Sequence, residues 1–493
     1  MRSVNRPGIP EPIADPEHQL ARSATSVFAG GKWTVARSCE RLPVNDSHTE
    51  QVIGSVRVGL PEDVDLAVAA ARVARPDWSQ TPAADRRDYL IALANELGGH
   101  REFLANLITE ETGTPLESSR TLQVDFAADL LHSFAAVTPD LEQTRHLGNA
   151  IIREVPRGVV GAIVPWNLPL ASIVLKLGAA LAAGCTVVVK PSEVAPLDAV
   201  ILAEAIAAAG IPPGVANIVF GTGVDVGEAL VRHHDVDCIS FTGSTGAGRR
   251  ISEIAAGTLK PVSLELGGKS AMVVLDDADL PAAVARCIDS AMLTVNGQAC
   301  DALTRLVVPR SMRADTESII VDLVEKIAVG DPKEPRNQLG PLVSRKQQER
   351  LDELITSALS RGARALVGGP GRPEYVESGY YARPTVLTCE SSSDFAAQVE
   401  FFGPVITVLG YETESEALAI ANDSEYGLSG CVWSGDRERA SSLARQMRAG
   451  QVYVNDADYN IFAPYGGFGQ SGHGREQGEF GVREFLTLQA LLA

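Results

Sequence analysis

The chain has 493 residues, 45% of them hydrophobic, and a net charge of −19. This length is more than one hydrophobic core ordinarily supports, so two or more domains are expected. The acidic balance disfavours nucleic acids and anionic membranes as partners, because both repel negative charge, and we predict neither.

Seven cysteines and eight histidines bear on the compartment and on metal binding. No two cysteines form a C-x-x-C pair, and the histidines show no H-E-x-x-H or similar ligand spacing. Scattered cysteines are typical of a reducing compartment and argue against a disulfide framework. We therefore predict a cytoplasmic protein with no metal site.

The first 24 residues are rich in proline and charge and lack the apolar core of a signal peptide. Residues 1–24 are predicted to form a flexible arm. The longest apolar run, 168–185, contains Ser172, Lys176 and two glycines. This composition favours a buried helix that leads into a strand over a membrane span.

The segments that follow predict an α/β fold. Helices are expected over 61–75 and 83–108, where apolar residues recur at helical spacing. Short apolar strands then alternate with helices, the strands at 159–164, 186–190, 216–220 and 238–241 and the helices at 169–183, 197–209, 225–232 and 246–256. Such alternation predicts a parallel sheet with helices on both faces.

A second series of strands and helices begins near Pro261, and we place the main domain boundary near Glu265. Strands are expected at 262–266, 271–275, 303–308, 405–411 and 430–433, and helices at 280–295, 312–327, 346–361 and 437–448. Residues 368–381, rich in glycine and proline, are expected to be a long loop. Ligands of open α/β sheets bind at the carboxyl ends of the strands, where the motifs below occur.

Cys300 carries the strongest chemical signal. A lone cysteine is usually a buried apolar residue, but here it follows Asn296-Gly297-Gln298-Ala299, at the predicted end of a helix. Small and polar neighbours on a loop favour an exposed nucleophile. The string 298–300 is also similar to the caspase motif, but Asp301 does not continue it, and no histidine lies about 50 residues upstream.

Glu265 ends a predicted strand and precedes Gly267 and Gly268, which permit a sharp turn and close approach to a ligand. Thiol chemistry needs a base twice, once for the thiol and once for the water that hydrolyses a thioester. Glu265 could be this base. The alternative is a solvated glutamate beside structural glycines.

Asn167 lies between a predicted strand and a predicted helix, in Pro165-Trp166-Asn167-Leu168-Pro169. Its amide could stabilise an oxyanion together with the backbone N–H of Cys300. The alternative is an asparagine that caps the helix.

Three further motifs could bind a dinucleotide. Lys190 and Glu193, at the end of a strand, could bind ribose hydroxyls, and the carboxylate would repel a 2′-phosphate and so favour NAD over NADP. Gly243 and Ser244 open a helix whose N-terminus could hold phosphate. Glu400 could reach a second ribose. The alternative for these motifs is that they form surface turns without a ligand. The glycine-rich segment 464–476 is likewise consistent with turns near an interface.

Taken together, these blocks resemble the aldehyde dehydrogenase superfamily. The similarity extends from about Phe28 to the C-terminus. The blocks occur in the family's order: PWNLP at 165–169, KPSE at 190–193, FTGSTGAG at 241–248, ELGGKS at 265–270, NGQAC at 296–300, EFFGPV at 400–405, and PYGGF with SGHGRE within 464–476. Lesser matches are ETGTP at 111–115, LGPL at 339–342 and YARPT at 381–385.

The resemblance implies roles for individual residues. Cys300 matches the nucleophile, Glu265 the general base and Asn167 the oxyanion-hole amide, and Lys176 matches a lysine near the proton path. The implied cofactor is NAD, with NADP left open. Its implied contacts are Lys190 and Glu193 at the adenosine ribose, Trp166 and Ser244 at the pyrophosphate, and Glu400 at the nicotinamide ribose, with Gly243 and Phe402 as further contacts.

The resemblance also implies the domain organisation. A Rossmann-like cofactor domain is expected over 25–137 and 158–264, and an α/β catalytic domain over 265–470. A small β element over 138–157 and 471–493 would bridge subunits of a homodimer or homotetramer.

The implied reaction is oxidation of a small-molecule aldehyde through a Cys300 thiohemiacetal and thioester, which Glu265-activated water hydrolyses. The presence of Glu265 favours this over a CoA-acylating semialdehyde dehydrogenase, and the intact Cys300 and Asn167 argue against a catalytically silent NAD-binding member.

The chain departs from the family's common pattern at several positions. Leu168 and Leu175 replace aromatic residues and predict a wider aliphatic tunnel. Asp301, if it faces the tunnel, would disfavour acidic aldehydes and suit hydroxy- or amino-aldehydes. Val399 and Gly469 replace an acid and a lysine, and the sequence offers no physical reason for either.

Overall fold

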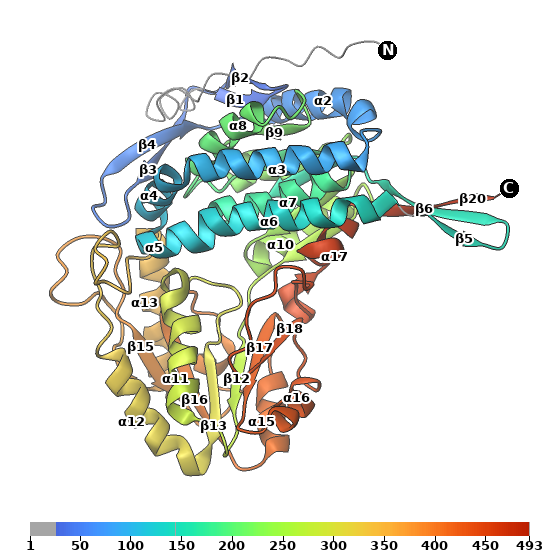
Figure 1. The fold of residues 1–493 in the computed structure, drawn as a ribbon. Helices are drawn as coiled ribbons and strands as arrows, with labels where there is room; N and C mark the ends of the chain where they lie inside the picture. The colour runs from blue at the N-terminus through green and yellow to red at the C-terminus, as the bar shows by residue number, and fades with distance from the viewer. Residues whose placement is uncertain (1–25, 143, 493) are drawn as a thin grey trace.

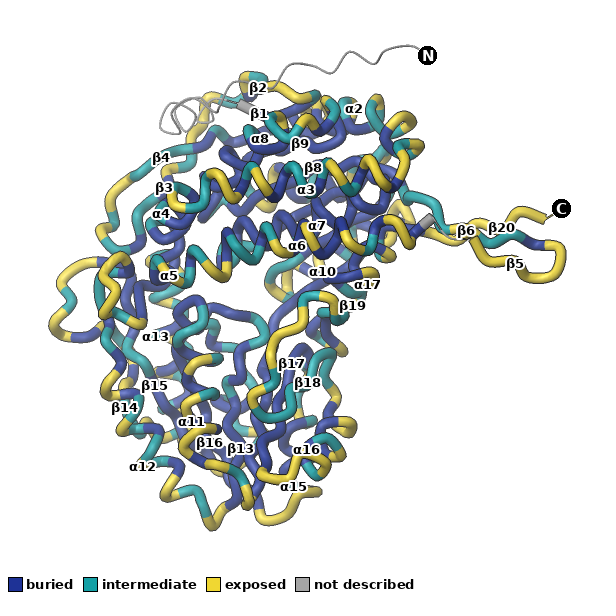
Figure 2. The backbone as a smooth tube through the Cα atoms, in the orientation of Figure 1, coloured by how far each residue is buried: buried dark blue, intermediate teal, exposed yellow. Residues whose placement is uncertain are grey.

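The structure is a computed structural model that describes residues 26–142 and 144–492. The arm predicted over 1–24 lies outside these residues. The chain folds into two lobes, and a thin antiparallel arm projects from the body and carries the C-terminus (Figure 1). Buried residues fill the interior of both lobes, whereas the projecting arm is mostly exposed (Figure 2).

An eight-stranded sheet lies at the centre of the first lobe. Its order is β19 (Gly472–His473), β11 (Val262–Glu265), β10 (Cys238–Thr242), β7 (Val159–Ile163), β8 (Thr186–Lys190), β9 (Ala216–Ile218), β1 (Ser26–Ala29) and β2 (Lys32–Val35). The strands from β11 to β9 run parallel, as predicted. Val187 and Val189 enter one core and Val188 the other, since side chains alternate along a strand.

Helices cover both faces of this sheet, which explains its nearly continuous apolar strands. They are α2 (Pro61–Trp78), α3 (Ala83–Gly99), α4 (Arg101–Thr112), α5 (Leu116–Ser118), α6 (Phe126–Val137), α7 (Pro169–Ala182), α8 (Asp198–Ala208), α9 (Glu228–Arg232), α10 (Thr245–Ala256) and α17 (Gly478–Arg483). Shorter turns are η1 (Ser119–Asp125), η2 (Thr138–Glu142) and η3 (Gly223–Gly227), and β3 (Arg41–Asn45) pairs with β4 (Val52–Arg57).

The second lobe is built on a seven-stranded sheet. Its order is β14 (Arg364–Val367), β15 (Thr385–Thr388), β16 (Val405–Tyr411), β13 (Arg305–Pro309), β12 (Ala271–Val274), β17 (Ser429–Trp433) and β18 (Gln451–Val454). All but β14 are parallel to their neighbours. The helices are α11 (Leu280–Ile288), α12 (Arg313–Val324), α13 (Arg345–Ser360), α14 (Phe395–Gln398), α15 (Glu414–Asn422) and α16 (Arg437–Ala444), with shorter turns η4 (Asp289–Leu293), η5 (Thr294–Gly297), η6 (Arg310–Met312) and η7 (Gly469–Ser471).

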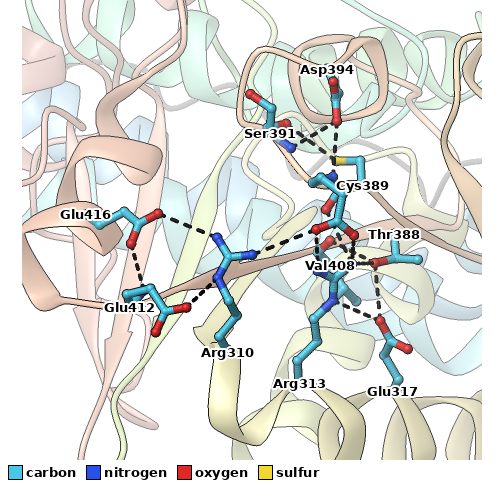
Figure 3. A network of polar contacts seen from close by, with 11 residues as sticks. Arg310, Arg313, Glu317, Thr388, Cys389, Ser391, Asp394, Val408, Glu412 and Glu416 are labelled. Atoms are coloured by element: carbon cyan, nitrogen blue, oxygen red, sulfur yellow. Dashed lines mark hydrogen bonds and ion pairs between the residues drawn. The ribbon is translucent and has the colours of Figure 1, made fainter.

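Two arginines tie the ends of these elements together at the surface of the second lobe (Figure 3). Arg313, at the start of α12, pairs with Glu317 at 3.0 Å and with Glu390 at 2.9 Å. Arg310 pairs with Glu412, in the turn after β16, at 2.9 Å. The carboxylates of this network, defined by Arg310, Arg313 and their partners, therefore have cationic neighbours.

The largest differences between prediction and structure concern two helices. The helix predicted over 83–108 is two helices, because the chain turns at His100, directly after two glycines that weaken helix. The helix predicted over 280–295 ends at Ile288 and unwinds through η4 and η5. The four-residue strands β14, β15 and β18 were not predicted, since their sheet partners rather than local pattern define them.

The projecting arm is a three-stranded sheet of order β20 (Leu486–Leu492), β6 (Ala150–Pro156) and β5 (Arg145–Leu147). All its pairs are antiparallel. β19, which falls in the range expected for the bridging element, instead pairs with β11 in the first sheet. Among the described residues, no helix combines the length and apolarity needed to cross a bilayer.

Candidate active site

A cavity of about 480 Å³ brings together residues of both lobes. Eight residues from the sequence-based predictions line it: Trp166, Asn167, Gly243, Ser244, Glu265, Cys300, Glu400 and Phe402. Lys176, Lys190 and Glu193 do not line it. The carboxyl ends of β11, β10, β7 and β8 lie at one edge of the first sheet, which explains how segments far apart in sequence meet.

The loop before Cys300 is locally strained. Val295, Asn296 and Gly297 all have left-handed backbone, with φ of 50°, 58° and 73°. A branched residue such as Val295 rarely adopts this conformation, so the surrounding structure must enforce it. This run ends the helical path early and turns the chain so that Cys300 faces the cavity.

Two buried amides hold this loop. The side chain of Asn296 donates to the carbonyls of Gly113 (2.8 Å) and Pro341 (2.9 Å) and accepts from Gly340 N–H (2.9 Å). The side chain of Gln298 accepts from Val343 N–H at 3.1 Å. These bonds give the segments around Gly113 and Gly340 a physical role, since they satisfy the amides that fix the nucleophile loop.

Cys300 lies on this loop, partly buried, and its sulfur is 3.2 Å from the hydroxyl of Tyr465. Burial raises the pKa of the thiol, and the nearby Asp301, Glu400 and Glu265 raise it further, whereas the hydrogen bond with Tyr465 lowers it. The thiol therefore needs a base and hydrogen-bond donors to become a thiolate.

Glu265 ends β11 with both carboxylate oxygens buried and without a hydrogen-bond partner among the described residues. Burial raises the pKa of this carboxyl well above its usual range, and Glu476 raises it further, while Lys176 opposes the shift. A Cβ on Gly466 would lie 2.6 Å from Oε1 of Glu265, so the chain can pass the carboxylate only as glycine. A buried, unpaired carboxyl at a cavity wall is suited to act as a base.

Lys176 lies on α7 behind the cavity wall. Its ammonium donates to Thr242 at 2.7 Å and pairs with Glu476 at 2.5 Å. Glu476 itself lines the cavity. Lys176 thus reaches the site through Glu476 and does not line the cavity itself.

Asn167 does not cap α7, because Leu168 occupies the cap position and no side-chain cap bond forms. The side-chain amide of Asn167 instead donates to the backbone carbonyl of Gln298 at 2.8 Å, and the backbone carbonyl of Asn167 accepts from the side-chain amide of Gln123 at 3.1 Å. Because an amide carries two N–H donors, the second remains for a ligand in the cavity.

Glu400 and two aromatic side chains form another part of the wall. Glu400 accepts from Gly268 N–H at 2.9 Å, and a Cβ on Gly267 would lie 2.4 Å from the Glu400 carboxylate. The rings of Trp166 and Phe402 meet edge to face with centroids 5.4 Å apart. The glycine pair that follows Glu265 therefore positions Glu400.

Ser244 caps α10 and accepts from Ala247 N–H at 3.3 Å, so the first turn of this helix opens toward the cavity rim. Lys190 ends β8, and its ammonium lies 2.5 Å from the carboxylate of Glu193. These two residues form a polar pair at the same sheet edge, outside the cavity wall.

The remaining wall is mainly apolar, with Leu122, Phe126, Leu168 and Leu175 among its lining residues. Asp301 also lines the cavity, and burial raises the pKa of its carboxyl.

Arg286 lines the cavity as well and pairs with Asp289 at 2.9 Å.

Gly469 has φ of 59°, and a Cβ there would lie 2.6 Å from the Glu425 carbonyl, which explains a glycine at this position. Val399 is partly buried and packs against the apolar cluster that contains Phe401 and Val405, which accounts for an apolar residue at this position.

The sequence-based predictions missed two residues of the site, Tyr465 and Glu476. Both belong to the glycine-rich segment that was interpreted as turns. The backbone N–H groups of Tyr465 and Glu476 each donate to the carbonyl of the other, at 2.9 and 2.8 Å. The signal was present in the motifs PYGGF and SGHGRE, whose polar residues lie between glycines that allow close approach.

The sequence predicts that the protein has no metal site, and this stays a prediction. Outside the cavity, His233, His234 and Asp235 form a group whose ligand atoms lie within 4.8 Å of one another.

Comparison with known proteins identifies the family. The model of the aldehyde dehydrogenase family matches residues 33–491. A 3-succinoylsemialdehyde-pyridine dehydrogenase of a Pseudomonas species is 42% identical over 472 residues, which are 96% of this chain and 99% of that protein.

Solved structures agree. A mutant of aldehyde dehydrogenase C from Pseudomonas syringae, in complex with NAD+ and octanal, is 40% identical with a TM-score of 0.92 and covers 95% of this chain and 97% of its own. Betaine aldehyde dehydrogenase of Staphylococcus aureus, a point mutant in complex with NAD+, is 35% identical with a TM-score of 0.93 over 97% of each chain. The chain therefore belongs to the aldehyde dehydrogenase family, which confirms the resemblance and the expected enzyme class.

Proposed function

We propose that the protein oxidises an aldehyde to the carboxylic acid with NAD, through a covalent thioester on Cys300 that water hydrolyses. The convergence of Cys300, Glu265 and Asn167 on one cavity carries this proposal. These three side chains are the nucleophile, base and oxyanion donor that the reaction requires.

In the proposed mechanism, Cys300 loses its proton to Glu265 and its sulfur attacks the aldehyde carbon. The resulting oxyanion accepts hydrogen bonds from the free N–H of Asn167 and from the backbone N–H of Cys300. Bound NAD supplies the hydride acceptor for the oxidation. Glu265 gives up this first proton before hydrolysis and then takes a proton from water. The water oxygen bonds to the thioester carbon, the C–S bond breaks with its electron pair returning to sulfur, and the carboxylic acid is released. Glu476 and Lys176 pass the proton onward from Glu265.

The residues present fit NAD. The N-terminus of α10, opened by Gly243 and Ser244, suits a pyrophosphate. Lys190 and Glu193 would bind one ribose, and the Glu193 carboxylate favours NAD over NADP because it repels a 2′-phosphate. Glu400, whose carboxylate is held by the N–H of Gly268, would bind the second ribose. The first sheet is accordingly proposed as the cofactor domain and the second as the catalytic domain.

Neutral aldehydes are the proposed substrate class. The apolar wall of Leu122, Phe126, Leu168 and Leu175 suits an aliphatic or aromatic body, and the octanal bound by the Pseudomonas syringae relative is of this kind. Asp301 adds a carboxyl group that would repel an acidic aldehyde and accept a hydrogen bond from a hydroxyl or amino group.

The test is NADH formation across a panel of aliphatic, aromatic, hydroxy-, amino- and acidic aldehydes, with Cys300→Ala as control. The proposal expects activity that requires Cys300 and does not require CoA. Acyl-CoA formation would instead identify the CoA-acylating alternative, and failure to oxidise any aldehyde despite NAD binding would identify a silent member.

Asp301 is tested separately. We expect Asp301→Ala to raise kcat/KM for acidic aldehydes relative to neutral ones. An unchanged preference between charged and neutral aldehydes would remove Asp301 from substrate selection.

We also propose that the arm joins subunits of a homodimer or homotetramer. β20 is an edge strand with one unpaired side, and an open edge can pair with another chain. Leu147, Leu488 and Leu492 on the arm are 64%, 70% and 75% exposed. Light scattering of the protein and of Leu488→Asp tests this, since a variant that keeps the wild-type mass would contradict it.

A further inference from the structure

The hydroxyl of Tyr465 lies 3.2 Å from the sulfur of Cys300. We propose that Tyr465 is a further catalytic residue, whose hydroxyl donates a hydrogen bond to the Cys300 sulfur whenever that sulfur carries negative charge. The proposal rests on the proposed role of Cys300 as nucleophile and extends it to a residue that no motif assigned.

The backbone of Tyr465 is fixed on both sides. Its N–H donates to the carbonyl of Glu476 at 2.9 Å, and its carbonyl accepts from Glu476 N–H at 2.8 Å. The next residue, Gly466, lies against Glu265. The hydroxyl is thus held by the same segment that brings Glu476 to the cavity, so its position relative to the sulfur is set before substrate binds.

The direction of the hydrogen bond follows from the charge on sulfur. With a neutral thiol, either group can be the donor. A thiolate has no proton to give, so only the phenol can donate to it. Burial raises the pKa of Tyr465 well above its usual range, and the phenol therefore keeps its proton as the donor.

A hydrogen-bond donor at the Cys300 sulfur is important because the other groups around the sulfur disfavour a thiolate. Besides burial, the acidic residues Asp301, Glu400 and Glu265 all disfavour a thiolate, while the bond with Tyr465 favours it. Asn167 directs one of its N–H groups to Gln298 rather than to the sulfur. Tyr465 is a neutral donor, so it offsets part of this negative field without adding a charge that would attract an acid.

The same bond acts at two steps. The thiol proton first passes to Glu265 and leaves a thiolate; when the C–S bond then forms, the sulfur electron pair goes to carbon and the carbonyl π pair goes to oxygen. When the thioester is hydrolysed, the C–S bond breaks and its electron pair returns to sulfur. Tyr465 stabilises the sulfur anion before the first step and after the second, and it transfers no proton in either.

The expected size follows from hydrogen bonds to charged groups. Loss of one such bond should reduce the thiolate fraction near neutral pH about 10- to 100-fold. Because nucleophilicity rises as the thiol becomes more basic, the rate of attack should fall less, roughly three- to fourfold for each tenfold loss of thiolate.

The experiment uses the full-length enzyme and Tyr465→Phe, which keeps the ring and removes only the hydroxyl. Alkylation of Cys300 by iodoacetamide is followed against pH, with Cys300→Ala to assign the labelled site. We expect the midpoint of the pH profile to rise by about one to two pH units, and kcat/KM near neutral pH to fall about 3- to 10-fold, with recovery at high pH.

The matched control is Tyr459→Phe. Tyr459 also lines the cavity, but its hydroxyl bonds to Gln477, so its loss should leave the alkylation profile unchanged. The ultraviolet absorbance of the thiolate, taken as the difference between each protein and its Cys300→Ala form, gives a second measure of the same ionisation.

The outcomes separate this proposal from the proposed function. If Cys300→Ala is inactive and Tyr465→Phe keeps the wild-type alkylation midpoint, only the role of Tyr465 is overturned. If Cys300→Ala keeps aldehyde oxidation, the proposed mechanism fails, and with it the reason for a catalytic Tyr465. An equal shift in Tyr459→Phe would show a general effect of the cavity wall and would also overturn the proposal.

Discussion

The cavity and the arginine network of the second lobe differ in how their charged groups are paired. In the network, Glu317 accepts from Arg313 at 3.0 Å, and Arg310 and Arg313 supply cations to the remaining carboxylates (Figure 3). In the cavity, both oxygens of Glu265 are buried without a hydrogen-bond partner in the described part of the chain, and three carboxyl groups lie near one thiol. Satisfied charges hold elements in place, whereas unsatisfied groups remain free to react, and this contrast separates scaffold from site.

Cys300→Ala is expected to have the largest effect on activity. It should lower kcat for aldehyde oxidation by at least about 10⁴-fold, because no other group can form the thioester. Steady-state NADH formation measures this. NAD binding and the melting temperature should stay near those of the wild type, and a loss of either would point to a structural role for the thiol.

Glu265→Gln comes next, with an expected loss of about 10²- to 10⁴-fold in kcat, the range of general-base catalysis. Wild-type activity should rise with pH as the carboxyl ionises, and the variant should lose this rise. A variant with the wild-type pH dependence would exclude Glu265 as the base.

The same variant tests stability. The pKa of Glu265 is raised in the folded state, mainly by burial. Its contribution to stability is therefore full below the pKa of the unfolded chain, about 4.3, and is lost as pH rises through the raised folded-state pKa. The melting temperature of Glu265→Gln minus that of the wild type should therefore increase from pH 5 to pH 8. This is about the range in which proteins are commonly most stable.

Asn167→Ala should lower kcat about 10²- to 10³-fold with little change in KM, because an oxyanion donor acts mainly in the transition state. The variant also leaves the carbonyl of Gln298 without its partner. The alkylation rate of Cys300 tells the two effects apart, since a displaced nucleophile loop would change it and a lost oxyanion donor would not.

The smallest effect is expected in the network. Arg313→Met should lower the free energy of unfolding by about 1–2 kcal/mol and leave kcat within about twofold of the wild type, since it lies outside the cavity wall. Arg310→Met is the matched control. Arg310 is more exposed, with 39% of its side chain accessible against 15% for Arg313, so its loss should cost less. Urea unfolding measures the loss of unfolding free energy in both variants. A large loss of activity in either variant would contradict a purely structural role for the network.

The sequence alone determined the fold class and the strands that carry the site. Val159–Ile163 and Thr186–Lys190 are short apolar runs between helices, and such alternation depends on local periodicity that any window of sequence contains. Cys300 and Glu265 were also within reach, since each stands beside glycines at the end of an element. The resemblance to a family then implied the oxyanion role that is proposed for Asn167, which local pattern left undecided between a cap and an oxyanion donor.

Only the tertiary structure decided what those residues meet. The left-handed run of Val295, Asn296 and Gly297 depends on bonds to Gly113 and Pro341, and no propensity predicts it because distant carbonyls enforce it. The contact of Tyr465 with Cys300, 165 residues apart in sequence, likewise exists only in the folded chain. Sequence pattern reports which residues can do chemistry, whereas burial and pairing, which decide whether they are free to do it, are properties of the folded chain.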